Sequence, residues 1–293
     1  VTAAHFDHRL RPATEVAAER ELVQDVGTAL GIRVLHGRAA GVPTDRSEGP
    51  ARAARYDWLA RACLEAAAAY CVTGHTLDDQ AETVLLRLVR GTGIGGAAGM
   101  AVRSAWPVVL RPSSGEAPPP LLVRPLLGIT RIDIEAYLTA VDIVAAADPS
   151  NDTLDYARNR IRGRVVPELR ALNPRAAEQI VAFAMQARAD DAALEAWASS
   201  TLHRIALPVA DGVSLERRAL LDLPEAVGSR VVRLATAGLG VGLDRAQTAA
   251  ALHAARARGR RAALGGGVEA WREGDRLIVG VPPQHSENLS VTR

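Results

Sequence analysis

Residues 70–91 change abruptly from a short apolar run to an amphipathic helix, and this change constrains the fold more than any other feature of the chain. The apolar run predicts a short buried strand, which Gly74 ends. Thr76 is a good N-cap and Asp79 completes a capping box, so a helix is predicted to start here and to end at Gly91. In open α/β sheets, ligands bind where strands end and helices begin. This turn is therefore expected to face a binding crevice.

One histidine and three acids lie at this turn and in the helix that follows it: His75, Asp78, Asp79 and Glu82. Acids in a first turn often do no more than complement the helix dipole. Asp79 and Glu82, however, lie one turn apart on one face of the helix. Carboxylate oxygens suit Mg²⁺ with substrate phosphates, and a carboxylate or His75 could accept a proton. The spacing predicts a ligand site without naming the ligand.

The first 173 residues alternate between short apolar runs and helical patterns. The predicted strands are 1–7, 32–35 and 70–73, and the predicted helices are 12–30, 50–69, 130–139 and 159–172. This alternation predicts parallel βαβ units, and hence an α/β fold with a doubly wound parallel sheet. Apolar residues around 108–110 and 121–123 predict a strand pair at the edge, and SSGEAPPP at 113–120 reads as a loop.

The alternation of predicted strands and helices changes after Asn173-Pro174, which we interpret as the boundary between domains at 1–173 and 174–283. A long alanine-rich helix is expected from 174 to about 202. The elements expected after it are a strand at 212–215, helices at 224–237 and 244–256, an apolar alternation at 262–264, and a hairpin of 268–272 and 276–281. This order predicts a linker helix followed by a second, smaller α+β domain. Residues 284–293 are expected to be a disordered tail.

Composition excludes several classes of protein. The chain is 48% hydrophobic, enough for a core, but no apolar run approaches the roughly 18–20 residues of a membrane span. The first residues carry no signal-peptide layout, and Cys63 and Cys71 form neither a CxxC nor a metal pattern, as expected in a reducing cytoplasm. The net charge is +2, yet all 35 basic residues are arginine, a flat and permanently charged fork suited to phosphate.

Several motifs in this chain resemble one known family, in the same order. GHTLDDQAET at 74–83, followed by RGTG and GM, resembles the signature of tRNA(Ile)-lysidine synthetases, which belong to the PP-loop ATP pyrophosphatase group. Further motifs that resemble this family are HFDHRLRP at 5–12, EGPARAARY at 48–56, RPLL at 124–127, DPSN at 148–151 and RNRIR at 158–162. The resemblance covers the chain from its first residue to about 283. It implies an adenine nucleotide alpha hydrolase-like fold whose first strand is missing.

The resemblance also implies roles for individual residues, some of which also have a simple structural explanation. It implies ATP or phosphate binding by His5, Asp7, Arg52, Arg55, Arg90, Gly91, Arg158 and Arg160. It implies tRNA contacts for Arg162, Arg256, Arg258, Arg260 and Arg261. From the residues alone, Arg52 is as well explained by an i,i+4 pair with Glu48, and cations after residue 255 by a helix C-terminus.

The reaction implied by the resemblance joins free L-lysine to the wobble cytidine of tRNA(Ile) with a CAU anticodon. ATP with Mg²⁺ would adenylate O2 of that cytidine, and the ε-amine of lysine would displace AMP. His75, Asp79 and Glu82 would be catalytic, and Asp78 and Asp79 would hold magnesium. We expect a cytoplasmic protein with no membrane partner. Monomer and homodimer both stay open.

One family motif is not found. PP-loop enzymes hold the pyrophosphate of ATP in an SGGxDS loop after their first strand, and the sequence contains no such loop. Either a strand and its loop precede Val1 in a longer protein, or the loop has been lost; we expect the former, because the downstream motifs are intact. One alternative is a non-catalytic or truncated tRNA-binding relative. A less favoured one is a tRNA thiolation enzyme, since Cys63 and Cys71, eight residues apart, fit a reactive pair poorly.

Overall fold

The structure is a computed structural model that describes residues 1–9, 12–41, 48–107, 120–145 and 156–282. Two compact units divide the chain, Val1–Arg188 and Ala189–Arg293. The division falls inside the long helix α8 (Ala176–Ile205). The domain boundary predicted at residue 173 lies just before that helix and stays a prediction.

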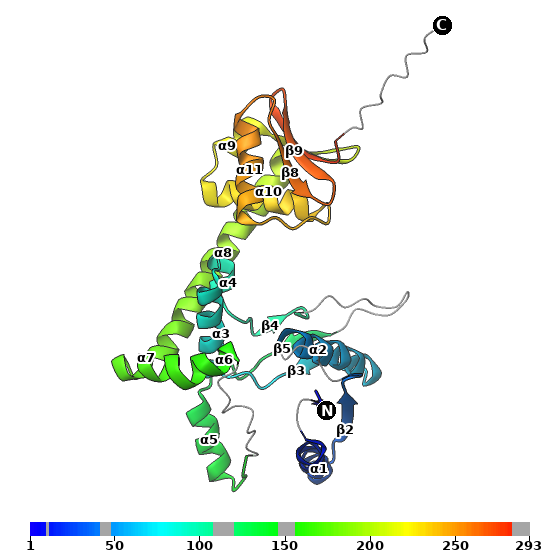
Figure 1. Ribbon diagram of the computed structural model, residues 1–293, viewed down its shortest axis with the longest axis vertical. Helices are drawn as coiled ribbons and strands as arrows, with labels where there is room; N and C mark the ends of the chain where they lie inside the picture. The colour runs from blue at the N-terminus through cyan, green and yellow to red at the C-terminus, as the bar shows by residue number, and fades with distance from the viewer. Residues whose placement is uncertain (10–11, 42–47, 108–119, 146–155, 283–293) are drawn as a thin grey trace. The chain divides into compact units, whose positions relative to one another are not determined.

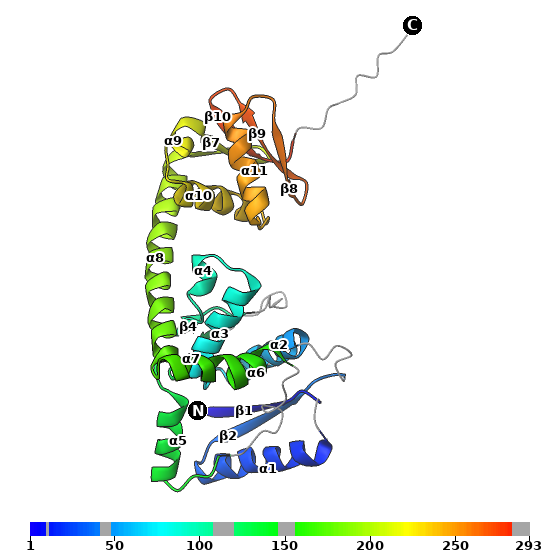
Figure 2. The same cartoon turned by 60° about the vertical axis from the view of Figure 1, so that its left-hand side comes forward.

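The first unit opens with a parallel β-α-β unit. Its elements are β1 (Thr2–Asp7), α1 (Ala13–Ala29) and β2 (Arg33–Arg38), and α2 (Glu48–Glu65) follows. His5 faces α1, where its ring nitrogen lies 3.8 Å from Glu19, while Phe6 faces α2 and lies 5.4 Å from the Trp58 ring. A side chain on Gly37 would collide with Trp58, so only glycine allows this close approach. Figure 2 shows α1 and α2 on opposite sides of the strand pair, as a doubly wound sheet requires.

A second group of strands carries the turn before α3. The strands β3 (Tyr70–Val72), β5 (Leu121–Val123) and β4 (Arg103–Ser104) form a sheet in the order β3-β5-β4. β3 and β5 are parallel, and β4 runs antiparallel at the edge. Tyr56 of α2 is buried against Cys71 of β3 and Leu122 of β5, and these three residues form a core cluster between the helix and this sheet. The predicted parallel α/β sheet is confirmed, although in the described residues it comes in two pieces, β1-β2 and β3-β5-β4.

Helix α3 (Leu77–Arg90) begins and ends where the sequence predicts. Thr76 is its N-cap and Gly91, with a φ of 82°, its C-cap. The chain then forms the short helix α4 (Ile94–Ala97) and folds back along α3. The Gln80 side chain fixes this return, because it bonds both the N–H and the C=O of Met100 at 2.7 and 2.8 Å. The contact between α3 and α8 is made by Leu77, Ala81, Ala177 and Val181.

The end of the first unit is helical. α5 (Arg131–Ala140) starts at the predicted N-cap, Thr130. The helix predicted over 159–172 is instead three consecutive segments, namely α6 (Ala157–Arg160), the π-helical turn η2 (Ile161–Val165) and α7 (Val166–Leu172). Pro167 explains the interruption, because it has no N–H to continue the hydrogen-bond ladder of the preceding turn. Figure 1 shows α6 and α7 beside the start of α3.

The second unit is a five-stranded antiparallel sheet with helices packed against it. Its elements after α8 are β6 (Ala206–Val209), β7 (Gly212–Glu216), α9 (Arg217–Leu221), α10 (Glu225–Ala237), α11 (Arg245–Arg256), β8 (Arg261–Gly265), β9 (Val268–Glu273) and β10 (Arg276–Gly280). The strand order is β6-β7-β10-β9-β8, and a core of valine, leucine and alanine joins the sheet to α10 and α11 (Figure 1). This confirms the predicted second sheet. The sequence analysis missed β6, an edge strand that contains Pro208, and α9, which is too short to show a period.

Some predictions fall outside the described residues. These are the strand around 108–110, nearly all of the loop at 113–120, the DPSN motif at 148–151 and the tail at 284–293. In the part of the chain that the structure describes, no helix combines the length and the apolar character needed to cross a membrane.

Candidate active site at the start of helix α3

The first turn of α3 is held in place by its own cap. The Thr76 hydroxyl accepts the Asp79 N–H at 3.3 Å, and the Asp79 carboxylate accepts the Thr76 N–H at 2.9 Å. The N–H of Leu77, free of any helical partner, donates to the Ile129 carbonyl at 2.9 Å. The backbone that carries His75, Asp79 and Glu82 is therefore fixed from both sides.

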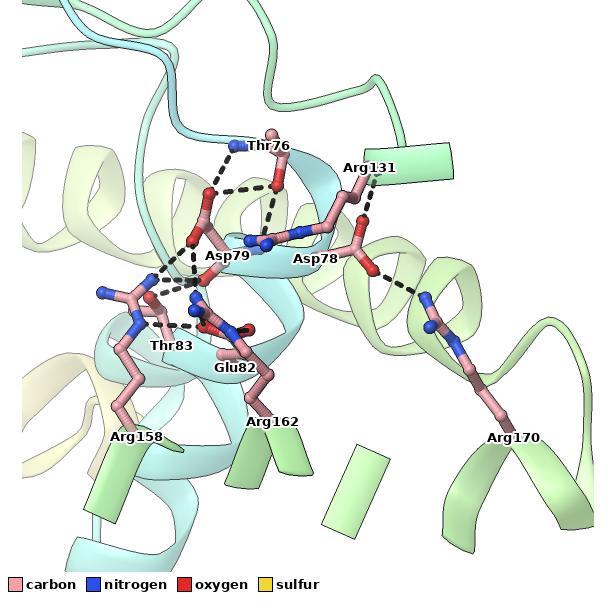
Figure 3. Close-up of polar contacts among 9 residues, drawn as sticks. All are labelled: Thr76, Asp78, Asp79, Glu82, Thr83, Arg131, Arg158, Arg162 and Arg170. Carbon is pink, nitrogen blue, oxygen red and sulfur yellow. Dashed lines mark hydrogen bonds and ion pairs between the residues drawn. The ribbon is translucent and has the colours of Figure 1, made fainter. Parts of the chain in front are cut away.

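Asp79 and Glu82 meet two arginines of the RNRIR motif (Figure 3). Arg158 Nε donates to Glu82 Oε2 at 2.8 Å, and its Nη2 donates to Asp79 Oδ1 at 3.0 Å. Arg162 Nε donates to Glu82 Oε1 at 2.6 Å, and its Nη2 reaches Asp79 Oδ1 at 3.4 Å. The Glu82 side chain is only 3% exposed and that of Asp79 15%. We call these four residues the ion-pair quartet; its two negative and two positive charges balance.

The local fold explains why both arginines reach the same acids. Arg158 and Arg162 are four residues apart, which puts them on one face of a helix. The π-helical turn that begins at Ile161 adjusts that face against α3. Short π-helical turns of this kind occur often at functional sites.

The acids predicted to hold magnesium are already engaged by protein donors. Asp78 Oδ1 accepts from Arg170 at 2.6 Å, and its Oδ2 accepts the Arg131 N–H at 2.7 Å. Both oxygens of Asp79 are taken by Thr76 and by the arginines of the ion-pair quartet. Across the described residues, no group of three or more His, Cys, Asp and Glu side chains could hold a metal ion. In this arrangement Asp78 and Asp79 hold arginines and backbone N–H groups. Their predicted role as magnesium ligands stays a prediction.

His75 is a neutral base beside the ion-pair quartet. Its Nδ1 lies 2.8 Å from the Thr73 hydroxyl. Burial lowers the pKa of His75 to about 4; the Asp79 carboxylate opposes this shift, while the nearby arginines, led by Arg124 and Arg52, add to it. For Asp79, burial would raise the pKa, but the bonds from Thr76 and the charge of Arg158 outweigh it, so the pKa is lowered. At neutral pH the site thus offers an uncharged imidazole beside ionised carboxylates.

A cavity of about 860 Å³ opens next to His75, between β1 and β3. Arg55, Tyr56 and His75 line it. The Arg52 guanidinium lies 4.9 Å from the centre of the Tyr56 ring, and that of Arg55 lies 5.4 Å from it. Two predicted phosphate-binding arginines are therefore close to the histidine that the sequence places in the catalytic group.

Comparison with known proteins explains this arrangement. Residues 1–169 match the model of a PP-loop domain. The chain is 37% identical over 250 residues to the tRNA(Ile)-lysidine synthase of Leifsonia xyli subsp. xyli, in an alignment that covers 83% of this chain and 70% of that protein. The chain belongs to the tRNA(Ile)-lysidine synthase family.

Other members of this family differ in length from the chain. The tRNA(Ile)-lysidine synthase of Methylobacterium nodulans is 40% identical over 81% of this chain and 66% of its own length. That of Geobacillus kaustophilus is 35% identical over 80% of this chain, which spans about half (49%) of that protein. A solved U34-tRNA thiolase, NcsA from Methanococcus maripaludis, has a TM-score of 0.48 and 14% identity over 63% of this chain and 61% of its own. That likeness is too small to add to the assignment.

Not all residues that the family resemblance singled out lie at the site. Asp7 pairs with Arg38 at 3.0 Å, and His5 faces α1, so these two residues contact neighbours within the first β-α-β unit. Arg90 and Gly91 lie at the far end of α3, about 20 Å from its start at 1.5 Å per residue. Arg160 is exposed, two residues from Arg158 and from Arg162. The roles of all five in phosphate binding stay predictions.

The predicted tRNA contacts of the second unit sit at the end of α11 and the start of β8. Arg256, Arg258 and Arg260 are exposed, as a phosphate-binding surface requires. Arg261 lies 3.5 Å from Glu269 and 5.6 Å from the centre of the Trp271 ring. Arg260 and Arg261 also line a cavity of about 420 Å³ together with His253.

Sequence reasoning missed two features of the site. Arg170, the partner of Asp78, lies beyond the RNRIR motif and carries no signal of its own. Cys63 and Cys71 are too far apart in sequence to suggest a pair, yet α2 and β3 bring their thiols close together. Each thiol changes the pKa of the other: the pKa of Cys63 is lowered, and the pKa of the buried Cys71 is raised. Sequence spacing does not show it, because the contact joins a helix to the strand after it.

Proposed function

We propose that the chain catalyses the reaction for which its relatives are named, the joining of lysine to the wobble cytidine of tRNA(Ile) with a CAU anticodon. ATP activates the cytidine: its O2 attacks the α-phosphate, and pyrophosphate leaves. The ε-ammonium of lysine first loses one proton. The free amine then attacks C2, the C2–O2 bond breaks and AMP leaves, and the nitrogen of the new C–N bond loses a second proton. The observation that carries this proposal is the ion-pair quartet, formed from the family's two most specific motifs beside a neutral His75.

Glu82 and Asp79 suit the recognition of a lysine ammonium. They are largely buried carboxylates that already bind two guanidinium groups, so their surroundings favour cations. In our proposal the substrate ammonium takes the place of one guanidinium at Asp79. The displaced arginine then becomes available for a phosphate of ATP, for which its planar fork is suited. Binding of lysine and of the nucleotide would thereby support each other.

His75 is the proposed acceptor of the proton that the amine must lose. An imidazole whose pKa is about 4 is unprotonated at neutral pH, so its lone pair is available, although the low pKa makes it a weak base. The Asp79 carboxylate, which raises that pKa, would stabilise the imidazolium once the proton has been accepted. It lies at the turn where the adjacent cavity meets α3, within reach of a ligand bound there.

The tRNA must present an unstacked base to this site, because its reacting atom lies on a base edge. The chain has four Trp and two Phe, so aromatic platforms for stacking are scarce. We therefore assign most of the tRNA affinity to phosphate contacts of Arg162, Arg160 and the exposed arginines at the end of α11. A requirement for Mg²⁺, the use of free lysine, a homodimer and a cytoplasmic location remain predictions.

The test is lysine-dependent release of AMP from ATP in the presence of unmodified tRNA(Ile). It should be run on this chain and on a version in which an SGGxDS segment is joined ahead of Val1. We expect AMP release that needs both lysine and tRNA(Ile), and none with a tRNA whose wobble base is uridine. If neither protein releases AMP while both bind tRNA(Ile), the non-catalytic, tRNA-binding alternative is correct.

The closeness of the Cys63 and Cys71 thiols is the observation in favour of a second candidate, tRNA thiolation. The two candidates differ in their need for thiols, because the lysidine reaction uses none. A Cys63→Ser, Cys71→Ser double variant should keep its full lysine-dependent AMP release. AMP release that needs tRNA but no lysine, and that this variant loses while it still folds, would favour sulfur transfer.

A further inference from the structure

Four arginines converge near the turn that follows α4. Arg52 lies on α2, Arg87 on α3, Arg124 directly after β5, and Arg188 on α8. We call these four the arginine cluster. Three of them, Arg87, Arg124 and Arg188, belong to no site described so far.

Two of the guanidinium groups meet on one carbonyl. Arg87 Nη1 donates to Gly99 O at 2.9 Å and to Gly96 O at 3.0 Å. Arg188 Nη2 donates to Gly99 O at 3.2 Å and to Ala98 O at 2.6 Å. Each of these bonds uses a single nitrogen, so the other edges of both guanidinium groups remain for further acceptors.

The charge of the arginine cluster is not balanced. Among the side chains that the structure describes, which do not include that of Glu48, none of its members makes an ion pair with a carboxylate, whereas Asp78, Asp79 and Glu82 each have arginine partners. Burial lowers the pKa of Arg87, and the charges of Arg188, Arg52 and Arg124 lower it further. Backbone carbonyls offset only part of this repulsion, because they are dipoles rather than charges. Surplus positive charge of this kind attracts anions.

Two buried polar atoms beside the arginine cluster also lack partners among the described residues. Arg124 is 4% exposed, and its Nη1 donates to Ala101 O at 2.8 Å, but its Nε has no acceptor. The hydroxyl of fully buried Tyr56 forms no hydrogen bond of good geometry, but it lies beside the Arg124 guanidinium. Burial lowers the pKa of Arg124, and the contact with Tyr56 opposes that shift. The Tyr56 ring also contacts Arg52, whose guanidinium lies 4.9 Å from the ring centre. Buried donors without acceptors are costly, and they persist most often at binding sites.

We propose that the arginine cluster is a phosphate-binding site, distinct from the ion-pair quartet and built for more than one phosphate group. Guanidinium forks bind phosphate oxygens through paired, charge-assisted hydrogen bonds. Several guanidinium groups with free edges together match an oligophosphate chain or consecutive phosphodiesters. The ligand is therefore the triphosphate of a nucleotide or the backbone of an RNA, and both offer the same chemistry.

A purely structural role of the arginine cluster would have different consequences. If Arg87 and Arg188 only stabilised the turn at 96–99, their replacement would lower the stability of the fold without changing the affinity for anions. Arg52 separates the two interpretations, because it makes no hydrogen bond among the described residues and contributes only its charge and its contact with Tyr56. Its removal leaves the turn intact.

The test measures binding of inorganic tripolyphosphate, and separately of a tRNA transcript, to the full chain by titration calorimetry at low salt. The variants are Arg52→Gln and Arg188→Gln; the control is Arg33→Gln, an exposed arginine paired with Glu65 on the surface. We expect each cluster variant to bind tripolyphosphate about tenfold more weakly, the loss of one charge-assisted contact, while the control is unchanged. Tripolyphosphate should also raise the melting temperature of the unaltered chain more than that of Arg52→Gln.

The two titrations together identify the ligand. Weaker binding of tripolyphosphate with unchanged binding of tRNA assigns the site to a nucleotide, and weaker binding of tRNA assigns it to an RNA backbone. If both ligands bind the Arg52→Gln and Arg188→Gln variants as well as the control, the site does not exist. This experiment uses no lysine and measures no turnover, so its failure would leave the proposed lysidine reaction untouched, and the reverse also holds.

Discussion

At the scale of single residues, Glu82 contributes most to the stability of the ion-pair quartet. It is a nearly buried carboxylate that accepts three hydrogen bonds from two arginines. We predict that Glu82→Gln lowers the free energy of unfolding by ~3 kcal/mol, because it leaves two buried guanidinium groups with a single carboxylate. Urea unfolding measures this. Glu65→Gln is the matched control: Glu65 pairs with Arg33 at 2.7 Å, but both side chains are about 60% exposed, so at most ~1 kcal/mol should be lost. If both variants lose the same free energy of unfolding, burial of the ion-pair quartet does not add to its stability.

His75 gives the site a pH dependence with a definite sign. Its pKa is about 4 in the folded chain and about 6.5 when unfolded, so between these values only the unfolded chain takes up the proton. Stability should therefore fall as the pH drops from about 6.5 to about 4, by on the order of 1–2 kcal/mol after solvent screening is allowed for. The comparison is the free energy of unfolding of the unaltered chain and of His75→Gln at several pH values. In His75→Gln the free energy of unfolding should fall less between about pH 6.5 and about pH 4, whereas replacement of the exposed His253 should leave this pH dependence unchanged. An unchanged pH dependence in His75→Gln would contradict the lowered pKa of His75.

At the scale of elements, the cap of α3 does two things at once. Thr76 closes the helix start and also bonds the Asp79 carboxylate through both its N–H and its hydroxyl. We predict that Thr76→Ala costs ~1 kcal/mol of stability and also raises the pKa of Asp79, with a loss of AMP release. Thr130→Ala removes the same capping box from α5 and should cost about the same stability without a loss of activity. Proportional loss of activity in both variants would show that Thr76 acts through stability alone.

The elements also show what sequence reasoning can reach. The capping signals at Thr76 and Thr130 are local, and α3 and α5 begin directly after these residues. The helix predicted from residue 244 likewise begins at Arg245. The acids of α3 and the arginines of RNRIR are recognisable as separate motifs, but their pairing joins residues 76 to 83 positions apart and cannot be read from either. The π-helical turn before Pro167 escapes prediction for a similar reason, since periodicity over 159–172 predicts one regular helix. The predicted magnesium ligands, Asp78 and Asp79, stay a prediction, because acids in the first turn of a helix can bind arginines or a metal ion, and the sequence does not separate the two roles.

At the scale of the whole molecule, the arginines of the three sites differ in their electrostatic surroundings. Those of the ion-pair quartet are neutralised by buried carboxylates. Those of the arginine cluster have no carboxylate partner among the described residues. Those at the end of α11 are exposed to solvent. A chain with a net charge of only +2 can therefore still bind a polyanion, because part of its positive charge is concentrated where few acids oppose it.

This division predicts how tRNA binding responds to salt. Exposed arginines bind phosphates by releasing counterions, so each contact adds roughly 0.7–0.9 to the slope of log K against log salt. Replacing the surface arginines at the end of α11 and the start of β8 with glutamine should weaken tRNA binding and lower that slope by roughly 2–3. The residues to replace are Arg256, Arg258, Arg260 and Arg261. Filter binding over a range of salt concentrations measures the slope. A double variant of two other arginines of the same unit, Arg218 and Arg233, controls for the loss of charge and should keep the slope. If it lowers the slope as much per residue, the second unit attracts tRNA through its net charge and not through a defined surface.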